Sequence, residues 1–264
     1  MKKYFVIGNP IEHSLSPALH NYWIKENNIE ANYDKKKLEE FELEDLIFKV
    51  KKRKIDGLNV TVPFKNKVIS FLDKLTFEAE QTQSVNTIYF DGNGTIGHNT
   101  DIEGFELSIK NIKYNLNDKK ILILGAGGVV PSIIFALNKM KVSNIVVANR
   151  TKKNAENLKN LFKNLSVIDW GEVPDIDMII NATTLGLNNN DEFNLDFSKV
   201  KKNRLFYDVI YNPRTTRFLE IGKKLNCKIE NGKMMFIYQA LGSFRLWHGV
   251  TPKINENVIN LLDK

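Results

Sequence analysis

The sequence predicts an α/β protein with two units: an N-terminal α/β unit, then a parallel sheet with helices. Three observations predict this class. Within residues 1–100, strand and helix patterns alternate and end in a hairpin signal, Asp91-Gly92-Asn93-Gly94. Residues 119–151 have the pattern strand, glycine turn, helix, strand. After residue 151 strands and helices keep alternating, which is typical of parallel sheets, until helical patterns at 234–248 and 254–262 close the chain.

Composition limits the class of protein. The 264 residues are 42% hydrophobic and 26% charged, which is typical of a globular chain with a sizeable core. No apolar run reaches membrane-spanning length and the N-terminal run is too short for a secretion signal, so we expect a cytoplasmic protein without a membrane partner. The net charge is +7, but the lysines are scattered and lack a nucleic-acid motif, so no nucleic-acid partner is expected. One cysteine and four unclustered histidines predict no metal site.

The first hundred residues contain the following expected elements. Strands are expected at 4–7, 32–36, 57–62, 84–90 and 95–98, and helices at 16–27, 43–52, 68–72 and 77–83. The first helix has a clear start signal, because Ser16 can act as N-cap with Pro17 in the first turn.

The stretch 119–151 has the sequence pattern of a dinucleotide site. The buried strand 121–124 runs into Gly125-Ala126-Gly127-Gly128, and a helix follows from Val129. Gly125 permits a tight turn and Gly127 lets the backbone approach a pyrophosphate, while the helix N-terminus supplies N–H groups and positive dipole. The alternative is that the glycines only turn the chain.

The end of the next strand, 145–147, indicates NADP(H) rather than NAD(H). An NAD site usually carries Asp or Glu at this point, to hold the ribose hydroxyls. Here the chain continues as Asn149-Arg150-Thr151-Lys152-Lys153, without an acid. Arg150 can bind a 2′-phosphate bidentately and Lys152 can add charge, whereas a carboxylate would repel that phosphate. The alternative is that Arg150 is a solvated surface residue.

The rest of the second unit contains further expected elements. Strands are expected at 166–168, 178–181 and 205–209, helices at 152–164 and 216–225, and a polar loop at 187–198.

The segment 59–65, Asn-Val-Thr-Val-Pro-Phe-Lys, is the first candidate for chemistry outside the nucleotide region. On an alternating strand Asn59 and Thr61 face the same side. Lys65 stands where we expect a helix to begin, and the dipole there disfavours a cation, which suits acid/base work. The alternative is an exposed lysine after a proline turn, and these residues alone favour that alternative.

Three further groups of polar residues are candidates. Ser14 and Ser16 lie at the start of a helix, where hydroxyls and free N–H groups can bind an anion, although N-capping by Ser16 is the alternative. Asn86 and Asp101 lie beside the hairpin strands, and a helix cap is the alternative for residues 99–101. Of the four histidines only His98 is a rival acid/base group, because it is close to Asp101 in the sequence.

With these motifs assembled, the sequence resembles the shikimate dehydrogenase family over its whole length. The matching motifs are Gly8-Asn9-Pro10-Ile11, His13-Ser14-Leu15-Ser16-Pro17, Asn59-Val60-Thr61-Val62-Pro63-Phe64-Lys65, Val85-Asn86-Thr87, Asn99-Thr100-Asp101, Asn149-Arg150-Thr151, Asn181-Ala182-Thr183-Thr184-Leu185-Gly186, Asp208-Val209-Ile210-Tyr211-Asn212-Pro213, Asn231-Gly232 and Tyr238-Gln239-Ala240. They occur in the family's order.

The resemblance implies a domain plan and a reaction. Residues 1–100 would form a substrate domain, residues 101–232 an NADP-binding Rossmann domain, and the helices of 233–264 would pack back on the first domain, with the active site in the cleft between the domains. The implied reaction is the reversible reduction of 3-dehydroshikimate to shikimate by NADPH, in chorismate and aromatic amino acid biosynthesis.

The resemblance also implies site residues. Lys65 and Asp101 would be the catalytic pair. The substrate would be bound by Ser14, Ser16, Asn59, Thr61, Asn86, Tyr211 and Gln239. NADP(H) would be bound by Gly125, Ala126, Gly127, Gly128, Val129, Asn149, Arg150, Thr151, Lys152, Thr183, Val209 and Gly232.

The sequence departs from the family pattern at three places. Val129-Val130-Pro131-Ser132 replaces a common Ala-x-Arg-Ala, Phe77 stands where an acid is usual, and a second glycine is missing after Gly232. The alternatives are an NAD-tolerant quinate/shikimate dehydrogenase and a nucleotide-sensing binding protein on the same scaffold. The oligomeric state, a homodimer included, stays open, as does whether Lys65 donates the proton or stabilises charge.

Overall fold

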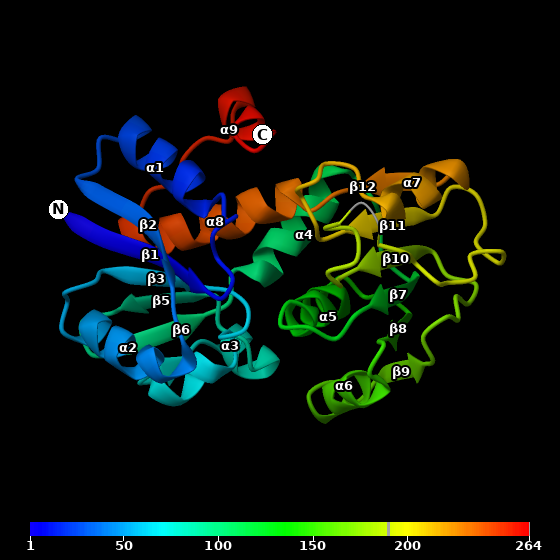
Figure 1. Cartoon of the computed structure of the whole chain (residues 1–264), viewed down its shortest axis with the longest axis horizontal. Coiled ribbons are helices and arrows are strands. Elements are labelled where there is room, and N and C mark those ends of the chain that lie inside the picture. The colour runs from blue at the N-terminus through cyan, green and yellow to red at the C-terminus, as the bar shows by residue number, and fades with distance from the viewer. Residues whose placement is uncertain (189–190, 264) are drawn as a thin grey trace. The chain divides into compact units, whose positions relative to one another are not determined.

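The computed structural model describes residues 1–188 and 191–263. They form two compact units, one of Met1–Gly104 with Ile237–Lys264 and one of Phe105–Phe236. Each unit has a six-stranded sheet within these residues, and Figure 1 shows helices against both sheets. The predicted α/β class is therefore confirmed, and the C-terminal helices belong to the first unit.

The sheet of the first unit is mixed, in the order β2-β1-β3-β5-β6-β4. Its strands are β1 (Lys2–Gly8), β2 (Ala31–Lys37), β3 (Gly57–Val60), β4 (Lys74–Leu75), β5 (Thr87–Phe90) and β6 (Thr95–His98). β1 is parallel to β2 and β3, whereas β5 is antiparallel to β3 and β6. The predicted hairpin is confirmed, because the Asp91 carboxylate accepts hydrogen bonds from the N–H groups of Asn93 (2.8 Å) and Gly94 (2.9 Å).

Helices cover both faces of this sheet (Figure 1). The helices of the first unit are α1 (Ser16–Glu26), η1 (Glu40–Glu42), α2 (Leu43–Lys51), η2 (Lys67–Phe71), α3 (Phe77–Thr82), the C-terminal part of α8 (Lys233–His248) and α9 (Glu256–Asn260). On one face Ile7 packs in a buried cluster with Leu46 of α2. On the other face Tyr4 packs against Trp247 of α8, with ring centroids 4.9 Å apart. Because side chains alternate along β1, neighbouring residues enter different cores.

The sheet of the second unit is all parallel, in the order β12-β11-β10-β7-β8-β9. Its strands are β7 (Lys120–Leu124), β8 (Asn144–Ala148), β9 (Leu165–Ile168), β10 (Met178–Asn181), β11 (Leu205–Asp208) and β12 (Lys228–Glu230). Its helices are the later part of α4 (Asp101–Asn111), α5 (Val130–Lys139), α6 (Lys152–Asn157), η3 (Leu158–Asn160) and α7 (Arg217–Lys224). The strand order reverses between β7 and β10, and ligands of open parallel sheets bind at such a switch point, beyond the carboxyl ends of the strands.

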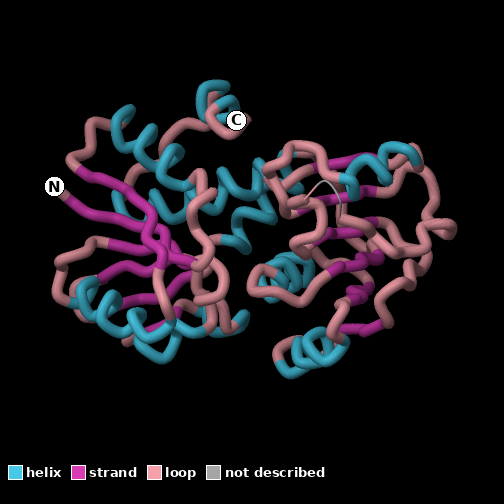
Figure 2. Tube along the Cα trace, in the orientation of Figure 1, coloured by secondary structure: helices cyan, strands magenta, loops and turns pink. Residues whose placement is uncertain are grey.

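Several expected elements differ from those in the structure, and the tube of Figure 2 shows where helix gives way to loop. The helix expected at 152–164 ends at Asn157 and continues as the short 3-10 helix η3, since Ala155 is the one residue that α6 buries in the core. The strand expected from residue 84 begins at Thr87. The sequence does not predict β4 and β12, because both are short and begin with lysine. No helix in residues 1–188 and 191–263 has the length and apolarity to cross a membrane.

Candidate active site

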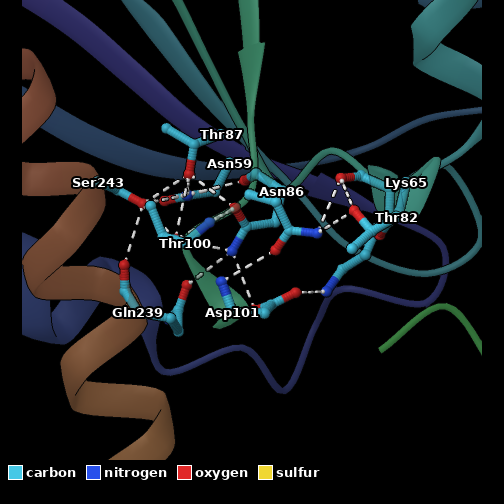
Figure 3. Close-up of polar contacts among 11 residues, drawn as sticks. Asn59, Lys65, Thr82, Asn86, Thr87, Thr100, Asp101, Gln239 and Ser243 are labelled. Carbon is cyan, nitrogen blue, oxygen red and sulfur yellow. Dashed lines mark hydrogen bonds and ion pairs between the residues drawn. The ribbon is translucent and has the colours of Figure 1, made fainter. Parts of the chain in front are cut away.

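Lys65 and Asp101 form a buried ion pair in the first unit. The Nζ of Lys65 lies 2.5 Å from Oδ2 of Asp101, and the two side chains are only 11% and 7% exposed. Lys65 lies in the turn after Pro63, and Asp101 is the first residue of α4, where a carboxylate interacts favourably with the helix dipole. The structure thus brings together two groups that are 36 positions apart in the sequence (Figure 3).

The expected electrostatic environment of Lys65 is wrong in one respect. The sequence predicts a helix that begins at Lys65, but η2 begins at Lys67 and is a five-residue 3-10 helix preceded by a turn. A short 3-10 segment that starts two residues later aligns few peptide dipoles with the ammonium group. Asp101, rather than a helix terminus, is therefore the main electrostatic partner of Lys65.

Asn86 links this pair to the rest of a buried polar network. Its Nδ2 donates to Oδ1 of Asp101 at 3.0 Å, to Oγ1 of Thr100 at 2.9 Å and to Oε1 of Gln239 at 3.4 Å. Its Oδ1 accepts from the N–H of Thr100 at 2.8 Å and from Oγ1 of Thr87 at 2.9 Å. Asp101 is thus held on one oxygen by Asn86 and on the other by Lys65, so the orientation of its carboxylate is fixed.

Asn59 lies at the other side of the same network (Figure 3). Its amide donates to the backbone oxygen of Asn86 at 3.0 Å and to Oγ of Ser243 at 2.9 Å, and its Oδ1 accepts from the hydroxyl of Tyr33 at 2.7 Å. Ser243 on α8 also pairs with Oγ1 of Thr87 at 2.8 Å. Asn59 therefore ties β3, β5 and α8 together within the first unit.

Ser14 and Ser16 lie at the start of α1, as expected, but Ser16 is not the N-cap. Leu15 holds the N-cap position without a side-chain hydrogen bond, and Ser16 is the first helical residue. The Ser16 side chain instead hydrogen-bonds Tyr33, whose pKa burial raises well above its usual value. Oγ of Ser14 accepts a hydrogen bond from the N–H of Ser16 at 3.3 Å. Simple capping by Ser16 is therefore excluded as the explanation of this motif.

The remaining predicted substrate residues are divided between the two units. Thr61 follows β3, and a Cβ added to Gly8 would come within 2.6 Å of its Cγ2, so the two motifs are packed together. Gln239 belongs to the first unit and accepts the Asn86 hydrogen bond described above. Tyr211 belongs to the second unit, where its ring packs against Phe236 with centroids 4.5 Å apart.

His98 has a different environment from the one its place in the sequence suggested. Its Nδ1 lies 2.8 Å from Oγ1 of Thr76, and Thr76 is the N-cap of α3. Burial lowers the pKa of His98. The ring therefore fastens the start of α3 to β6 and has a structural role there.

The glycine turn after β7 fits a bound dinucleotide. Gly125 has a φ of +110°, and a Cβ there would lie 2.8 Å from the backbone oxygen of Ala182, so only glycine suits this turn. A Cβ on Gly127 would meet nothing within 4 Å, which leaves its backbone open to a ligand. Gly128 and Val129 complete the turn, and Pro131 falls in the first turn of α5, where it is tolerated.

The strand end after β8 carries the basic residues expected of an NADP site. Asn149 donates from Nδ2 to the backbone oxygen of Thr151 at 2.8 Å. This hydrogen bond closes the short turn that contains Arg150, and Arg150 itself is exposed. Lys152 forms an ion pair with Asp169 at 2.8 Å, and this pair raises the pKa of Lys152. Arg150 is thus exposed at the surface, whereas the ammonium group of Lys152 is paired with the carboxylate of Asp169.

Three further residues that the resemblance assigns to the cofactor follow the carboxyl ends of β10, β11 and β12. Thr183 follows β10, and its Oγ1 donates to Oδ1 of Asn181 at 2.7 Å. Val209 follows β11, and its N–H donates to the backbone oxygen of Asn181 at 3.0 Å. A Cβ on Gly232 would come within 2.1 Å of the backbone oxygen of Val209, so glycine is required for this approach. Among residues 1–188 and 191–263, no cluster of His, Cys, Asp or Glu could hold a metal ion.

The sequence reasoning gave no role to several members of these networks, although Thr87, Thr100 and Asp208 stand in the matching motifs. Tyr33, Thr87, Thr100 and Ser243 carry the polar network of the first unit, and Asp208 lies fully buried among the loops of the second. One signal was present for Ser243, because it lies four residues after Gln239 and so falls on the same face of a helix. Tyr33 gave no signal, since an isolated tyrosine in a lysine-rich strand looks like an ordinary core residue.

Two protein-family models together match most of the chain. A model described as the shikimate dehydrogenase substrate binding domain matches residues 6–88, and one described as shikimate / quinate 5-dehydrogenase matches residues 106–217. A shikimate dehydrogenase (NADP(+)) from Pelagibacter ubique (strain HTCC1062) is 56% identical over 264 residues, which cover 100% of both chains.

Solved structures agree with this result. A shikimate dehydrogenase in complex with NADP+ matches with a TM-score of 0.92 and 33% identity, over 99% of this chain and 94% of that chain. The shikimate 5-dehydrogenase of Thermus thermophilus, in complex with NADP(H) and shikimate, matches with a TM-score of 0.90 and 29% identity, over 99% and 98% of the two chains.

Proposed function

The chain belongs to the shikimate dehydrogenase family, and from this premise we propose that Lys65 and Asp101 are its catalytic pair. The enzyme is NADP-dependent and reversibly reduces 3-dehydroshikimate to shikimate, a step in the biosynthesis of chorismate and aromatic amino acids. One observation carries the proposal: a nearly buried ammonium–carboxylate pair whose carboxylate is fixed by an asparagine of the same substrate domain.

The reduction adds a hydride to the ketone carbon and a proton to the ketone oxygen. When bound, NADPH supplies the hydride. Lys65 has three N–H donors and Asp101 accepts from one of them, which leaves donors for the substrate oxygen. The ammonium can either transfer a proton to that oxygen or stabilise the negative charge developing on it. Asp101 keeps the ammonium in place for both roles.

The remaining predicted residues would bind and orient the substrate. Ser14 and Ser16 present hydroxyl groups at the N-terminus of α1, an 11-residue helix whose dipole favours an anion, so we propose that they hold the substrate carboxylate. The amides of Asn86 and Gln239 lie 3.4 Å apart beside Asp101, and such paired amides suit the ring hydroxyls of shikimate.

The residues of the second unit would bind NADP(H). The turn of residues 125–129 would bind the pyrophosphate, because only glycine fits at position 125 and the space beside the backbone of Gly127 is open to a ligand. Arg150, with its neighbours in 149–152, would bind the 2′-phosphate. Thr183, Val209 and Gly232 would line the cofactor at the switch point.

A turnover assay tests the proposal. The unmodified enzyme is mixed with shikimate and either NADP+ or NAD+, and the absorbance of the reduced cofactor is followed. We expect turnover with NADP+, and a fall in kcat of about 10²–10⁴-fold for Lys65→Ala with an unchanged Kd for NADP+. Lys67→Ala is the matched control, because Lys67 lies two residues away and pairs with Glu40 at the surface. Near-normal kcat in Lys65→Ala would remove Lys65 from the mechanism.

A second candidate function is an NAD-tolerant quinate/shikimate dehydrogenase. The family description of residues 106–217 names both substrates, which is the observation in its favour. The exposed Arg150 and the lack of an acid at the end of β8 argue against NAD. Adding quinate and NAD+ arms to the same assay separates the two, because a dual-specificity enzyme would turn over quinate at a rate comparable with shikimate.

A further inference from the structure

Asp208 is a buried carboxylate at the carboxyl end of β11, in the second unit. It is 0% exposed. Its Oδ1 accepts hydrogen bonds from Nδ2 of Asn181 at 3.0 Å and from the N–H of Ile210 at 3.0 Å. Its Oδ2 accepts from Oγ1 of Thr216 at 2.6 Å. The carboxylate therefore joins the end of β10, the loop after β11 and the N-cap of α7.

Through Asn181, Asp208 is linked by hydrogen bonds to the loop 182–186. The other amide contacts of Asn181 go to this loop, because its Nδ2 donates to the oxygen of Leu185 at 2.9 Å and its Oδ1 accepts from Oγ1 of Thr183 at 2.7 Å. Thr183 in turn accepts from the N–H of Leu185 at 3.0 Å. A rotation of the Asn181 amide would therefore displace Thr183.

Through Ile210, Asp208 is also linked by a hydrogen bond to the loop 209–213. The N–H of Ile210 points at the carboxylate, and its oxygen accepts from the N–H of Gly232 at 3.0 Å. Val209 and Tyr211 flank Ile210 in this loop. The first loop follows β10, which borders the switch point with β7, and the second follows β11, the neighbour of β10. Ligands of parallel sheets bind beyond such strand ends.

The ionised side chain is costly at this position. Within the part of the chain that the structure describes, no cation contributes to its environment, and its partners are an amide, a backbone N–H and a hydroxyl. Burial raises the pKa of Asp208 to about 6, despite the hydrogen bonds that lower it. Near pH 7 the fold therefore holds a carboxylate that burial destabilises, whereas a neutral residue would avoid this cost.

We propose that Asp208 is a positioning residue for the reaction: its carboxylate sets the loops 182–186 and 209–213 in register with each other, so that Thr183 and Val209 meet the cofactor. The proposal rests on the proposed function, which assigns these loops to NADP(H). Asp208 itself touches neither substrate nor cofactor and acts through Asn181 and Ile210.

The test compares Asp208→Asn with two other variants. Asn keeps the shape but removes the charge and presents a donor to groups that donate already. Asp196→Asn is the matched control, because Asp196 caps an exposed turn through the N–H of Ser198 at 2.9 Å. Thr216→Val loses the N-cap of α7 and the hydrogen bond to Oδ2 of Asp208, which should lower Tm by about 2–4 °C, but it leaves Oδ1 of Asp208 bound to Asn181 and Ile210.

For Asp208→Asn we expect kcat to fall by about 10–100-fold, as for a small misplacement of reacting groups, with Tm unchanged or higher. The Kd for NADP+, measured without turnover by tryptophan fluorescence, should rise about tenfold. Thr216→Val should show the reverse, a lower Tm with kcat and Kd within about threefold of the unmodified enzyme, and Asp196→Asn should change nothing.

Two results would overturn the proposal. The first is an Asp208→Asn enzyme with the Kd and kcat of the unmodified one. The second is evidence that Asp208 is needed for stability. This would be either a parallel loss of Tm and function in Asp208→Asn and Thr216→Val, or an Asp208→Asn chain that does not fold. An unmodified enzyme that binds NADP+ but does not oxidise shikimate would refute the proposed function instead, and the Kd comparison would still decide the role of Asp208.

Discussion

The ion pair of Lys65 and Asp101 allows a prediction about stability that is independent of any substrate. The perturbation is a double-mutant cycle of Lys65→Met, which keeps the aliphatic stem, and Asp101→Asn, which keeps the shape. The pair is only 11% and 7% exposed, so removing one partner leaves a nearly buried charge without its counter-ion. Such a loss typically costs about 3–5 kcal/mol.

The structure places the two single variants differently within that range. In Lys65→Met the Asp101 carboxylate keeps the hydrogen bond from Nδ2 of Asn86 at 3.0 Å, so we expect a loss of about 3 kcal/mol. In Asp101→Asn the ammonium loses its carboxylate partner, so we expect about 4 kcal/mol. The double variant carries neither charge and should lose only about 2 kcal/mol. The coupling is then about 5 kcal/mol, well above the error of a cycle.

Urea unfolding followed by tryptophan fluorescence measures the free energy of unfolding of each variant. Lys49 and Asp45 provide the control cycle, because this i,i+4 pair also lies at 2.5 Å but is 40% and 67% exposed, and such pairs couple by only about 0.3–0.5 kcal/mol. If the effects of Lys65→Met and Asp101→Asn add within about 0.5 kcal/mol, the two charges do not stabilise each other and Asp101 does not hold the ammonium in place.

Three other predictions address the cofactor, the substrate and acid stability. Arg150→Ala should weaken NADP(H) binding by about 1.5–3 kcal/mol and NAD(H) binding much less; equal losses, measured by titration, would show that Arg150 does not bind the 2′-phosphate. Ser14→Ala combined with Ser16→Ala should raise KM for shikimate and leave the Kd for NADP+ unchanged; an unchanged KM would place the anion site elsewhere. Burial lowers the pKa of His20 to about 3. The contribution of the neutral His20 side chain to the free energy of unfolding is therefore complete above the unfolded pKa of about 6.5 and is lost as the pH falls toward the folded pKa. His20→Phe keeps the stacking on Tyr33, with centroids 4.1 Å apart, and should reduce the loss of stability between pH 6 and pH 4 by about 2–3 kcal/mol; identical pH slopes would contradict this.

Local patterns in the sequence were enough to predict the elements that depend on neighbouring residues. The glycine turn at 125–128 and the hairpin turn at 91–94 are each specified by four consecutive residues, and both occur as expected. Apolar runs predicted the strands at 121–124 and 178–181, because a strand that is buried on both faces needs apolar residues throughout. Element ends were less certain, as α6 and η2 show, because they depend on tertiary packing.

The sequence by itself determined the α/β class, the family and which residue types form the candidate site. Only the tertiary structure decided how they are connected: Lys65 meets Asp101 rather than a helix dipole, Ser16 bonds Tyr33 rather than capping α1, and Asp208 joins two loops. The physical reason is that these contacts link residues far apart in the chain, such as Asn59 and Ser243, 184 positions apart. No local period encodes such a pair, because its partners meet only after the strands and helices have packed.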